Sequence, residues 1–222
     1  MAENSLALFK WATFDVRSLL PAQWDENLIE AAQRLNRRKK VSASHVTARE
    51  AHDVRELVIG NVDPAVVEAE LPWVRELYET LFLHLAQLTA DEPVSVAKDK
   101  GHTVILNVQT PEDTRYICHV DTNPIQGLLY VTTQPPGTGG ELVVGNKTTA
   151  SSLEEIEADC SIIYPQSGHL VFFDGRYNPH YIRPLLRPDD IRVAVAMNYY
   201  TPSVPESLRP SDLDDYLSGT VR

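Results

Sequence analysis

The spacing of apolar residues changes near Val94, and this change constrains the fold more than any other feature of the chain. From there to Tyr200, short runs of alternating apolar and polar residues replace helical spacing, as is typical of half-buried strands. We expect strands at 94–98, 103–109, 116–119, 128–133, 141–144, 161–164, 169–173, 180–185 and 192–200. Turns rich in proline, glycine and acidic residues separate them. About eight short strands of this kind predict a jelly-roll or double-stranded β-helix barrel.

The first part of the chain predicts one strand followed by helices. Residues 6–14 are apolar and aromatic and are expected to form the strand. Residues 21–35 place Trp24, Leu28, Ala31, Ala32 and Leu35 on one helix face. A second helical stretch follows Asp63 and Pro64, interrupted at Pro72, and its expected apolar face is Trp73, Leu77, Leu81 and Leu85 or Leu88. We therefore expect these helices to cover one face of the sheet.

The length of 222 residues is consistent with a single domain. Within it, we expect an N-terminal strand and supporting helices over 1–92, a double-stranded β-helix core over 93–202, and a C-terminal tail over 203–222 with a short helix at 213–217. The basic residues at 34–40 are interpreted as the C-terminus of a helix, where cations suit the helix dipole. The overall class is mainly β with a helical cap.

Charge and cysteine content restrict the partners and the compartment. The net charge of -11 disfavours binding to nucleic acid or to anionic membranes. Two cysteines form neither a disulfide framework nor a zinc-ligand pattern. The start of the sequence lacks the features of a signal peptide, and no apolar run reaches membrane-spanning length. We expect a cytoplasmic protein that acts on a small molecule, and its oligomeric state stays open.

Two histidines and an aspartate suggest a metal site. His119 and Asp121 lie two residues apart in an extended segment, so their side chains point the same way. His180 begins a later apolar run and could supply a third ligand. Two imidazoles and one carboxylate are the ligand set of non-haem iron oxygenases, which leaves coordination positions open. Arg192, near the start of the last long strand, could bind the far carboxylate of a dicarboxylic acid through two hydrogen bonds.

Several motifs occur together with these residues. They are YICHVD at 116–121, GGEL at 139–142, PQSGHLVFF at 165–173, RYNPH at 176–180, and Arg192 at the start of the last strand. In this order and at this spacing, the segment 115–202 resembles the iron(II)- and 2-oxoglutarate-dependent dioxygenases. The resemblance is strongest to their prolyl 4-hydroxylase-like branch.

The resemblance implies a cofactor and the roles of several residues. His119, Asp121 and His180 would bind Fe(II), and Arg192 would pair with the C5 carboxylate of 2-oxoglutarate. Dioxygen would be the second cosubstrate, and ascorbate is a candidate reductant. Because a carboxylate rather than a small residue stands at position 121, hydroxylation is expected rather than halogenation. The hydroxyl that supports the C5 carboxylate would come from Tyr130, Thr132 or Thr133.

The substrate side is less defined by the motifs. Tyr116 matches the tyrosine of the YxxHxD pattern, Arg176 precedes the distal histidine, and Asn107 lies near Gln109, where the family often has a tyrosine. We expect hydroxylation of an unactivated C–H bond in an amino acid or a natural-product intermediate, with succinate and CO2 as co-products. Hydroxylation of a prolyl residue in a protein or peptide is the alternative. A non-catalytic, metal-binding, cupin-like barrel is the third interpretation.

Overall fold

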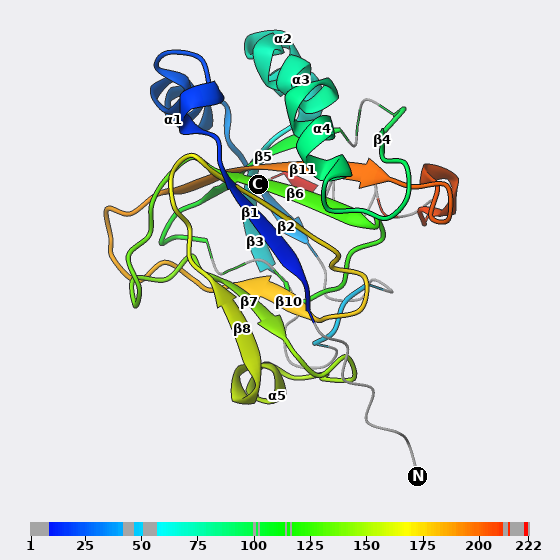
Figure 1. Cartoon of the computed structure of the whole chain (residues 1–222). Coiled ribbons are helices and arrows are strands. Elements are labelled where there is room, and N and C mark those ends of the chain that lie inside the picture. Colours follow the sequence, from blue (N-terminus) through cyan, green and yellow to red (C-terminus); the bar gives the residue numbers. More distant parts are fainter. Residues whose placement is uncertain are drawn as a thin grey trace.

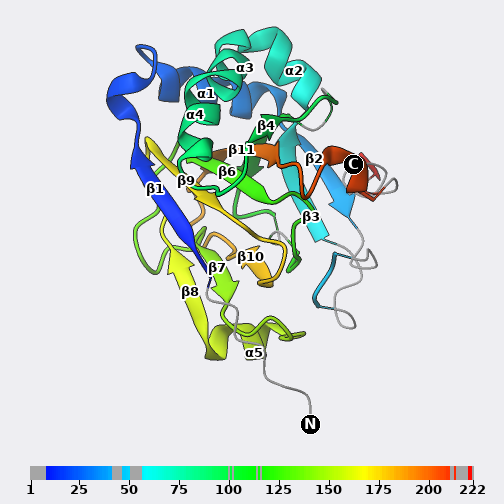
Figure 2. The ribbon, with the colours of Figure 1, turned by 45° about the vertical axis from the view of Figure 1, so that its right-hand side comes forward.

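The computed structural model describes residues 9–41, 47–50, 57–99, 101, 103–113, 115, 117–210, 213 and 220–221. Two antiparallel sheets make up most of the described fold (Figures 1 and 2). In spatial order the larger sheet contains β1 (Trp11–Asp15), β9 (His169–Phe173), β6 (Ile125–Tyr130), β11 (Arg192–Tyr200), β5 (Val104–Gln109), β3 (Leu57–Val62), β2 (Arg37–Val41) and β12 (Thr220–Val221), with β4 (Ser95–Val96) beside β11. The smaller sheet contains β10 (His180–Ile182), β7 (Leu142–Gly145) and β8 (Cys160–Ile163).

Four helices cover the outer face of the larger sheet, on the side away from the smaller sheet (Figures 1 and 2). They are α1 (Trp24–Leu35), α2 (Pro64–Glu70), α3 (Pro72–Glu79) and α4 (Leu81–Gln87). Pro64 and Pro72 occupy the first turns of α2 and α3, where a missing N–H has no cost. A fifth helix, α5 (Leu153–Ala158), packs against β7 and is capped at its N-terminus by Ser152, whose hydroxyl accepts the Glu155 N–H.

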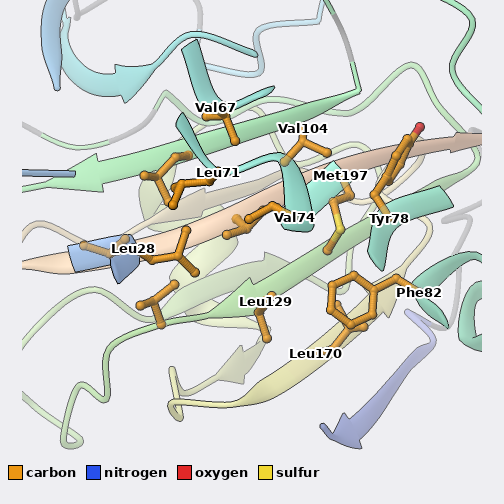
Figure 3. Packing of buried hydrophobic residues seen from close by; sticks show 14 of the residues in the cluster. Leu28, Val67, Leu71, Val74, Tyr78, Phe82, Val104, Leu129, Leu170 and Met197 are labelled. Carbon is orange, nitrogen blue, oxygen red and sulfur yellow. The ribbon is translucent and has the colours of Figure 1, made fainter. Parts of the chain in front are cut away.

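Alternation along the strands of the larger sheet creates two different faces. On β11, Val193, Val195, Met197 and Tyr199 all pack into the core beneath the helices. Figure 3 shows side chains from helices and strands interlocking in this core. The residues between them on β11 therefore face the smaller sheet, because side chains of a strand alternate between its two faces. That inner face carries the candidate site.

The helical face predicted for residues 73–88 is wrong in part. Val74, Tyr78 and Phe82 are almost completely buried, whereas Trp73 and Leu77 are only partly buried at the edge of the core. The stretch is apolar on two adjacent sides, and the pattern alone does not say which side meets the sheet. Here Tyr78 decides the orientation, because its hydroxyl donates to the Asn198 carbonyl of β11 and accepts the Ala97 N–H, both at 2.7 Å.

The assignment of the basic residues at 34–40 to a helix end is right for Arg34, which lies in the last turn of α1, and wrong for the residues from Arg37 onward. The structure ends α1 at Leu35 and places Arg37–Val41 in strand β2. Lys39 is buried there, and its ammonium group lies 2.6 Å from an Asp63 oxygen. β2 pairs with β3, a strand that the sequence analysis did not predict. β3 in turn pairs with β5, so the larger sheet extends beyond β5. Pairing with remote strands, rather than local propensity, explains the extended conformation here.

Other expectations agree with the structure to different degrees. Strands at 169–173 and 192–200 have the predicted bounds, whereas of the strand expected at 116–119 the described residues, 117–119, contribute only an isolated bridge at His119. Helix α5 was not predicted. The expected strand at 6–14 falls partly, and the helix at 213–217 mostly, outside the described residues. Across the part of the chain that the structure describes, no helix has both the length and the apolar character needed to span a membrane.

Candidate functional site

His119 and His180 are direct cross-strand neighbours, although 61 positions separate them in the sequence. The His119 N–H donates to the His180 carbonyl at 3.0 Å, and the His180 N–H donates to the His119 carbonyl at 2.9 Å. Side chains of such an antiparallel pair emerge on the same face. The two imidazole rings accordingly lie with their centroids 4.4 Å apart.

Asp121 lies two residues beyond His119 and completes the cluster. Its N–H donates to the Gly175 carbonyl at 3.0 Å, which fixes the segment against the loop before β10. One carboxylate oxygen lies 3.5 Å from Nε2 of His119, and the other lies 3.6 Å from Nε2 of His180. One possible ligand atom from each of the three residues lies within 4.8 Å of the other two. The structure therefore brings the three predicted ligands together around one point.

Backbone carbonyls determine which ring nitrogens can bind a metal. Nδ1 of His119 lies 2.7 Å from the Ile117 carbonyl, and Nδ1 of His180 lies 3.0 Å from the Asn178 carbonyl. A carbonyl only accepts, so each Nδ1 carries the hydrogen, and in the neutral imidazole each Nε2 presents a lone pair. Such outer hydrogen bonds orient histidine ligands in metal sites. Both Nε2 atoms point toward the Asp121 carboxylate.

The charges of the cluster are strongly coupled. Burial on its own would raise the pKa of Asp121, but the facing His180 and His119 outweigh burial and lower that pKa far below its usual range. Burial opposes protonation of His180, and the Asp121 carboxylate nevertheless raises the pKa of His180 above its usual value. Asp121 Oδ2 is buried and has no hydrogen-bond partner within the described part of the chain. The carboxylate is thus an anion directed at two imidazoles, as a cation site requires.

Gly175 was missed by the sequence analysis, and it packs directly on this cluster. A Cβ atom at this position would lie 2.2 Å from Asp121 Oδ2 and 2.8 Å from Cε1 of His180. Both distances are far shorter than real Cβ contacts. The position therefore requires a glycine because of space, not because of backbone conformation. The motif that precedes His180 gave no signal of this, since the close approach exists only in the folded chain.

Arg192 lies on the inner face of β11 and is 3% exposed. Its Nε donates to the Gly140 carbonyl at 2.9 Å, and its guanidinium lies over the Tyr130 ring, 5.5 Å from the centroid. Nη2 of Arg192 and the hydroxyl of Tyr130 are both buried and have no hydrogen-bond partner among the residues described. Burial lowers the pKa of Arg192 but leaves a group that is always charged in proteins. An anionic ligand would satisfy both groups.

The remaining candidates occupy different places. Thr133 is exposed, and its hydroxyl accepts the Ser167 N–H at 3.0 Å, so the structure does not bring it to the site. Thr132 similarly accepts the Val193 N–H at 3.0 Å. Arg176 forms an ion pair with Asp174 at 2.7 Å and does not line the cavity that contains the three ligands. Asn107 does line that cavity, whereas Tyr116 lies outside the described residues.

Cys118, which adjoins His119, points away from the cluster as expected from alternation. It is fully buried among Val143, Ile156 and Tyr181. Burial raises the pKa of its thiol to about 12. A thiol that stays protonated is a poor metal ligand, so Cys118 is a packing residue.

One cavity contains both groups of residues. Its volume is about 180 Å³, and its walls include the three ligands and Arg192. Gln109 also lines it, directly opposite Arg192 in the β5 and β11 register. Further lining comes from polar residues that the sequence analysis did not select, namely Asn123, Gln126 and Asn198. Alternation places Gln126 and Asn198 on the inner face, but nothing in the sequence showed that this face borders a cavity.

Several solved structures share this fold. SnoN, titled a non-heme alpha ketoglutarate dependent epimerase from nogalamycin biosynthesis, is 14% identical, with a TM-score of 0.56 over 90% of this chain and 83% of that chain. HygX from Streptomyces hygroscopicus, in a structure with nickel, 2-oxoglutarate and hygromycin B, is 14% identical, with a TM-score of 0.55 over 86% and 83%. A 2OG-Fe(II) oxygenase family oxidoreductase from Burkholderia pseudomallei is 13% identical, with a TM-score of 0.55 over 86% and 84%.

No protein-family model and no curated protein matches this sequence. At identities this low, the structural likeness establishes the fold alone. The chain has the double-stranded β-helix fold of the 2-oxoglutarate oxygenases, with helices against its larger sheet. The predicted fold class is confirmed, and the family resemblance is confirmed at the level of the fold.

Proposed function

We propose that this double-stranded β-helix protein is an iron(II)- and 2-oxoglutarate-dependent oxygenase that hydroxylates an unactivated C–H bond of a small molecule. One observation carries the proposal. Two Nε2 lone pairs and a carboxylate converge in the same cavity that contains a buried arginine with an unused donor. A metal site and an anion site joined in this way suit a cosubstrate that is both a chelator and a dicarboxylate.

The three ligands fit Fe(II). Two neutral imidazoles and one carboxylate form a facial ligand set that leaves other coordination positions free. His119 and His180 would bind through Nε2, since each Nδ1 is used by a backbone carbonyl. Asp121 would neutralise part of the metal charge and also holds the two rings at similar distances from its oxygens. The buried, unpartnered Asp121 Oδ2 is the atom that a cation would satisfy.

Arg192 and Tyr130 fit the distal carboxylate of 2-oxoglutarate. A buried charge without a partner destabilises a protein by several kcal/mol, which is why removal of one partner of a buried ion pair is so costly. The Arg192 guanidinium is such a charge, since no carboxylate forms an ion pair with it among the described residues. A bound carboxylate would accept from Nη2 and from the Tyr130 hydroxyl. Binding at this end would orient the 2-oxo acid end toward the histidines.

The cavity also suggests what kind of substrate enters. With Fe(II), 2-oxoglutarate and dioxygen bound, dioxygen would be the oxidant: 2-oxoglutarate and the substrate C–H bond would each give up two electrons, and the products would be the hydroxylated substrate, succinate and CO2. The protein binds these partners, orients them and keeps bulk water away. A cavity of about 180 Å³ favours a small molecule over a folded protein. Hygromycin B in the HygX structure, and the origin of SnoN in nogalamycin biosynthesis, support the same preference.

Anaerobic binding of Fe(II) and 2-oxoglutarate tests the proposal through the weak visible charge-transfer band of the complex. We expect the wild-type protein to form the band and His180→Ala to lose it. Arg192→Ala should weaken 2-oxoglutarate binding by roughly 2–5 kcal/mol, because a buried carboxylate then loses its partner. His84→Ala on α4 and Arg187→Ala in the turn before β11 are exposed controls that should leave the band unchanged. Absence of the band in the wild-type protein would contradict the proposal.

Succinate formation separates the two oxygenase hypotheses. Free amino acids and neutral small molecules should stimulate 2-oxoglutarate turnover if the substrate is small. Stimulation by prolyl peptides alone would favour prolyl-residue hydroxylation instead. A protein that binds iron but never 2-oxoglutarate would be a metal-binding barrel without this activity.

A further inference from the structure

The strand that carries the distal histidine is preceded by a proline that cannot complete the sheet. β10 lies beside β7 in the smaller sheet (Figures 1 and 2), and because His180 pairs with Val144, Pro179 stands opposite Gly145. The Gly145 N–H donates to the Pro179 carbonyl at 2.8 Å, as in a hydrogen-bonded antiparallel pair. The facing residue of such a pair normally donates its own N–H in return, but proline has none. The Gly145 carbonyl therefore lacks the usual backbone donor.

The side chain of Asn178 supplies that donor. Its Nδ2 donates to the Gly145 carbonyl at 2.8 Å, and the residue is 3% exposed. A carbonyl only accepts, so the nitrogen of the amide must face it. Both backbone groups of Gly145 are thus bound by the dipeptide at 178–179, directly before the metal ligand.

The backbone of Asn178 orients the imidazole of His180. The Asn178 carbonyl accepts the hydrogen of Nδ1 at 3.0 Å, and Nε2 on the other side of the ring lies 3.6 Å from an Asp121 oxygen. The direction of this carbonyl depends on how the dipeptide is attached to β7. One side-chain hydrogen bond therefore connects the end of β7 to the orientation of the distal histidine ring.

We propose that Asn178 is a positioning residue of the metal centre: its amide replaces the N–H that Pro179 lacks, holds the dipeptide on β7, and thereby keeps His180 oriented for metal binding. The inference rests on the metal-binding part of the proposed function and does not involve 2-oxoglutarate. Loss of the amide would leave the buried Gly145 carbonyl without this donor, an arrangement that folded proteins avoid. The dipeptide and the carbonyl that orients His180 would then shift.

Titration with Co(II) measures the effect of Asn178→Ala. We expect the dissociation constant to rise about 10–100-fold, the usual effect of removing a group that supports a metal ligand. Asn146→Ala is the matched control, because Nδ2 of Asn146 donates to Asp159 at 2.7 Å and secures the same end of β7 without contacting the dipeptide. The control should bind Co(II) like the wild-type protein. Wild-type affinity in Asn178→Ala, or an equal loss in both variants, would overturn the inference.

Pro179→Ala provides a rescue that a merely destabilising substitution would not show. The change restores a backbone N–H opposite Gly145, so adding it to Asn178→Ala should recover most of the lost Co(II) affinity. Pro179→Ala alone should bind Co(II) like the wild-type protein, since Asn178 still serves the carbonyl. If Asn178→Ala does not fold, the double variant is compared with Pro179→Ala instead. A folded double variant that has lost Co(II) binding would overturn the inference.

Hydrogen exchange in the His180 ring is a second readout, measured by NMR on histidine-labelled protein loaded with Zn(II). The hydrogen on Nδ1 should exchange slowly in the wild-type protein and in Asn146→Ala, because the Asn178 carbonyl holds it. It should exchange faster in Asn178→Ala. Free exchange in the wild-type protein, or slow exchange in all three proteins, would contradict the positioning role.

Failure of the proposed function gives a different pattern. If the wild-type protein binds Co(II) but not 2-oxoglutarate, the oxygenase assignment fails while the variants still test the role of Asn178. If the wild-type protein binds both and Asn178→Ala binds Co(II) equally well, the inference fails alone. A wild-type protein that binds no Co(II) would refute the metal centre itself, and the inference with it.

Discussion

Replacement of Gly175 by alanine is expected to abolish tight metal binding while the fold is retained. The added Cβ would lie 2.2 Å from Asp121 Oδ2, whereas ordinary Cβ contacts begin near 3.4 Å. The carboxylate must therefore move by about 1 Å, since 3.4 minus 2.2 is 1.2. Metal–ligand distances tolerate only about 0.2 Å. The variant should consequently lose Asp121 as a ligand in the native arrangement.

The expected size of the effect follows from that displacement. Changes to residues that merely support metal ligands cost about 10–100-fold in metal affinity. Displacement of a ligand itself should cost at least the upper value, so we expect the dissociation constant for Co(II) to rise about 100-fold or more, roughly 2.7 kcal/mol. The backbone of Gly175 is not among the positive-φ glycines, so alanine adds no backbone strain. Local overpacking should cost the apoprotein about 1–3 kcal/mol of stability.

Isothermal titration with Co(II), together with thermal unfolding of the apoprotein, measures both quantities. Gly101→Ala is a suitable control, because Gly101 is exposed and, among the residues that the structure describes, an added Cβ would meet the Asp99 carboxylate alone, at 3.3 Å. This control should bind Co(II) like the wild-type protein. Metal affinity of Gly175→Ala within threefold of the wild-type value would refute the steric argument. A variant that does not fold at all would show that Gly175 serves the fold rather than the ligand cluster.

Three further predictions concern pH, the cosubstrate pocket and the core. In the apoprotein, the raised pKa of His180 stabilises the fold at low pH, and this contribution is lost as the pH rises through that pKa. The lowered pKa of Asp121 stabilises the fold above about pH 4, and this second contribution is lost only in strong acid. Metal affinity should increase with pH near neutrality, because His180 binds a metal only as neutral imidazole. A Co(II) affinity that does not change from about pH 6 to 8 would contradict the coupling between His180 and Asp121. Tyr130→Phe should weaken 2-oxoglutarate binding about tenfold in the charge-transfer titration. Thr133→Ala, which removes an exposed hydroxyl, should leave that binding unchanged. Equal effects of the two substitutions would argue against a 2-oxoglutarate pocket formed by Arg192 and Tyr130. Tyr78→Phe should lower the free energy of unfolding by roughly 1–3 kcal/mol in urea titrations, because the buried Ala97 N–H and the Asn198 carbonyl both lose the hydroxyl as a partner. A change below about 0.5 kcal/mol would show that water replaces the hydroxyl.

Short-range patterns in the sequence were sufficient for much of the fold. The run at 192–200 contains β-branched and aromatic residues typical of strands and follows a turn, and the structure places β11 there with the predicted bounds. Spacing on one helix face likewise gave α1, including the buried Leu28 and Ala32. In contrast, Arg37–Val41 carries little β propensity, and its strand exists because β3 and β12 pair with it. Such pairing depends on residues far away along the chain.

The sequence by itself determined the chemical character of the candidate centre. His119, Asp121, His180 and Arg192 could be chosen from the sequence because metal binding and carboxylate binding need these side chains in this order. The chemical identity of a side chain is a local property, which the sequence gives directly. Only the tertiary structure decided which further groups border them. The approach of Gly175 to Asp121, the Gly140 carbonyl beside Arg192 and the pairing of Asn198 with Gln126 depend on register and loop packing between remote segments. Distances between such segments are set by the whole fold, and no local pattern encodes them.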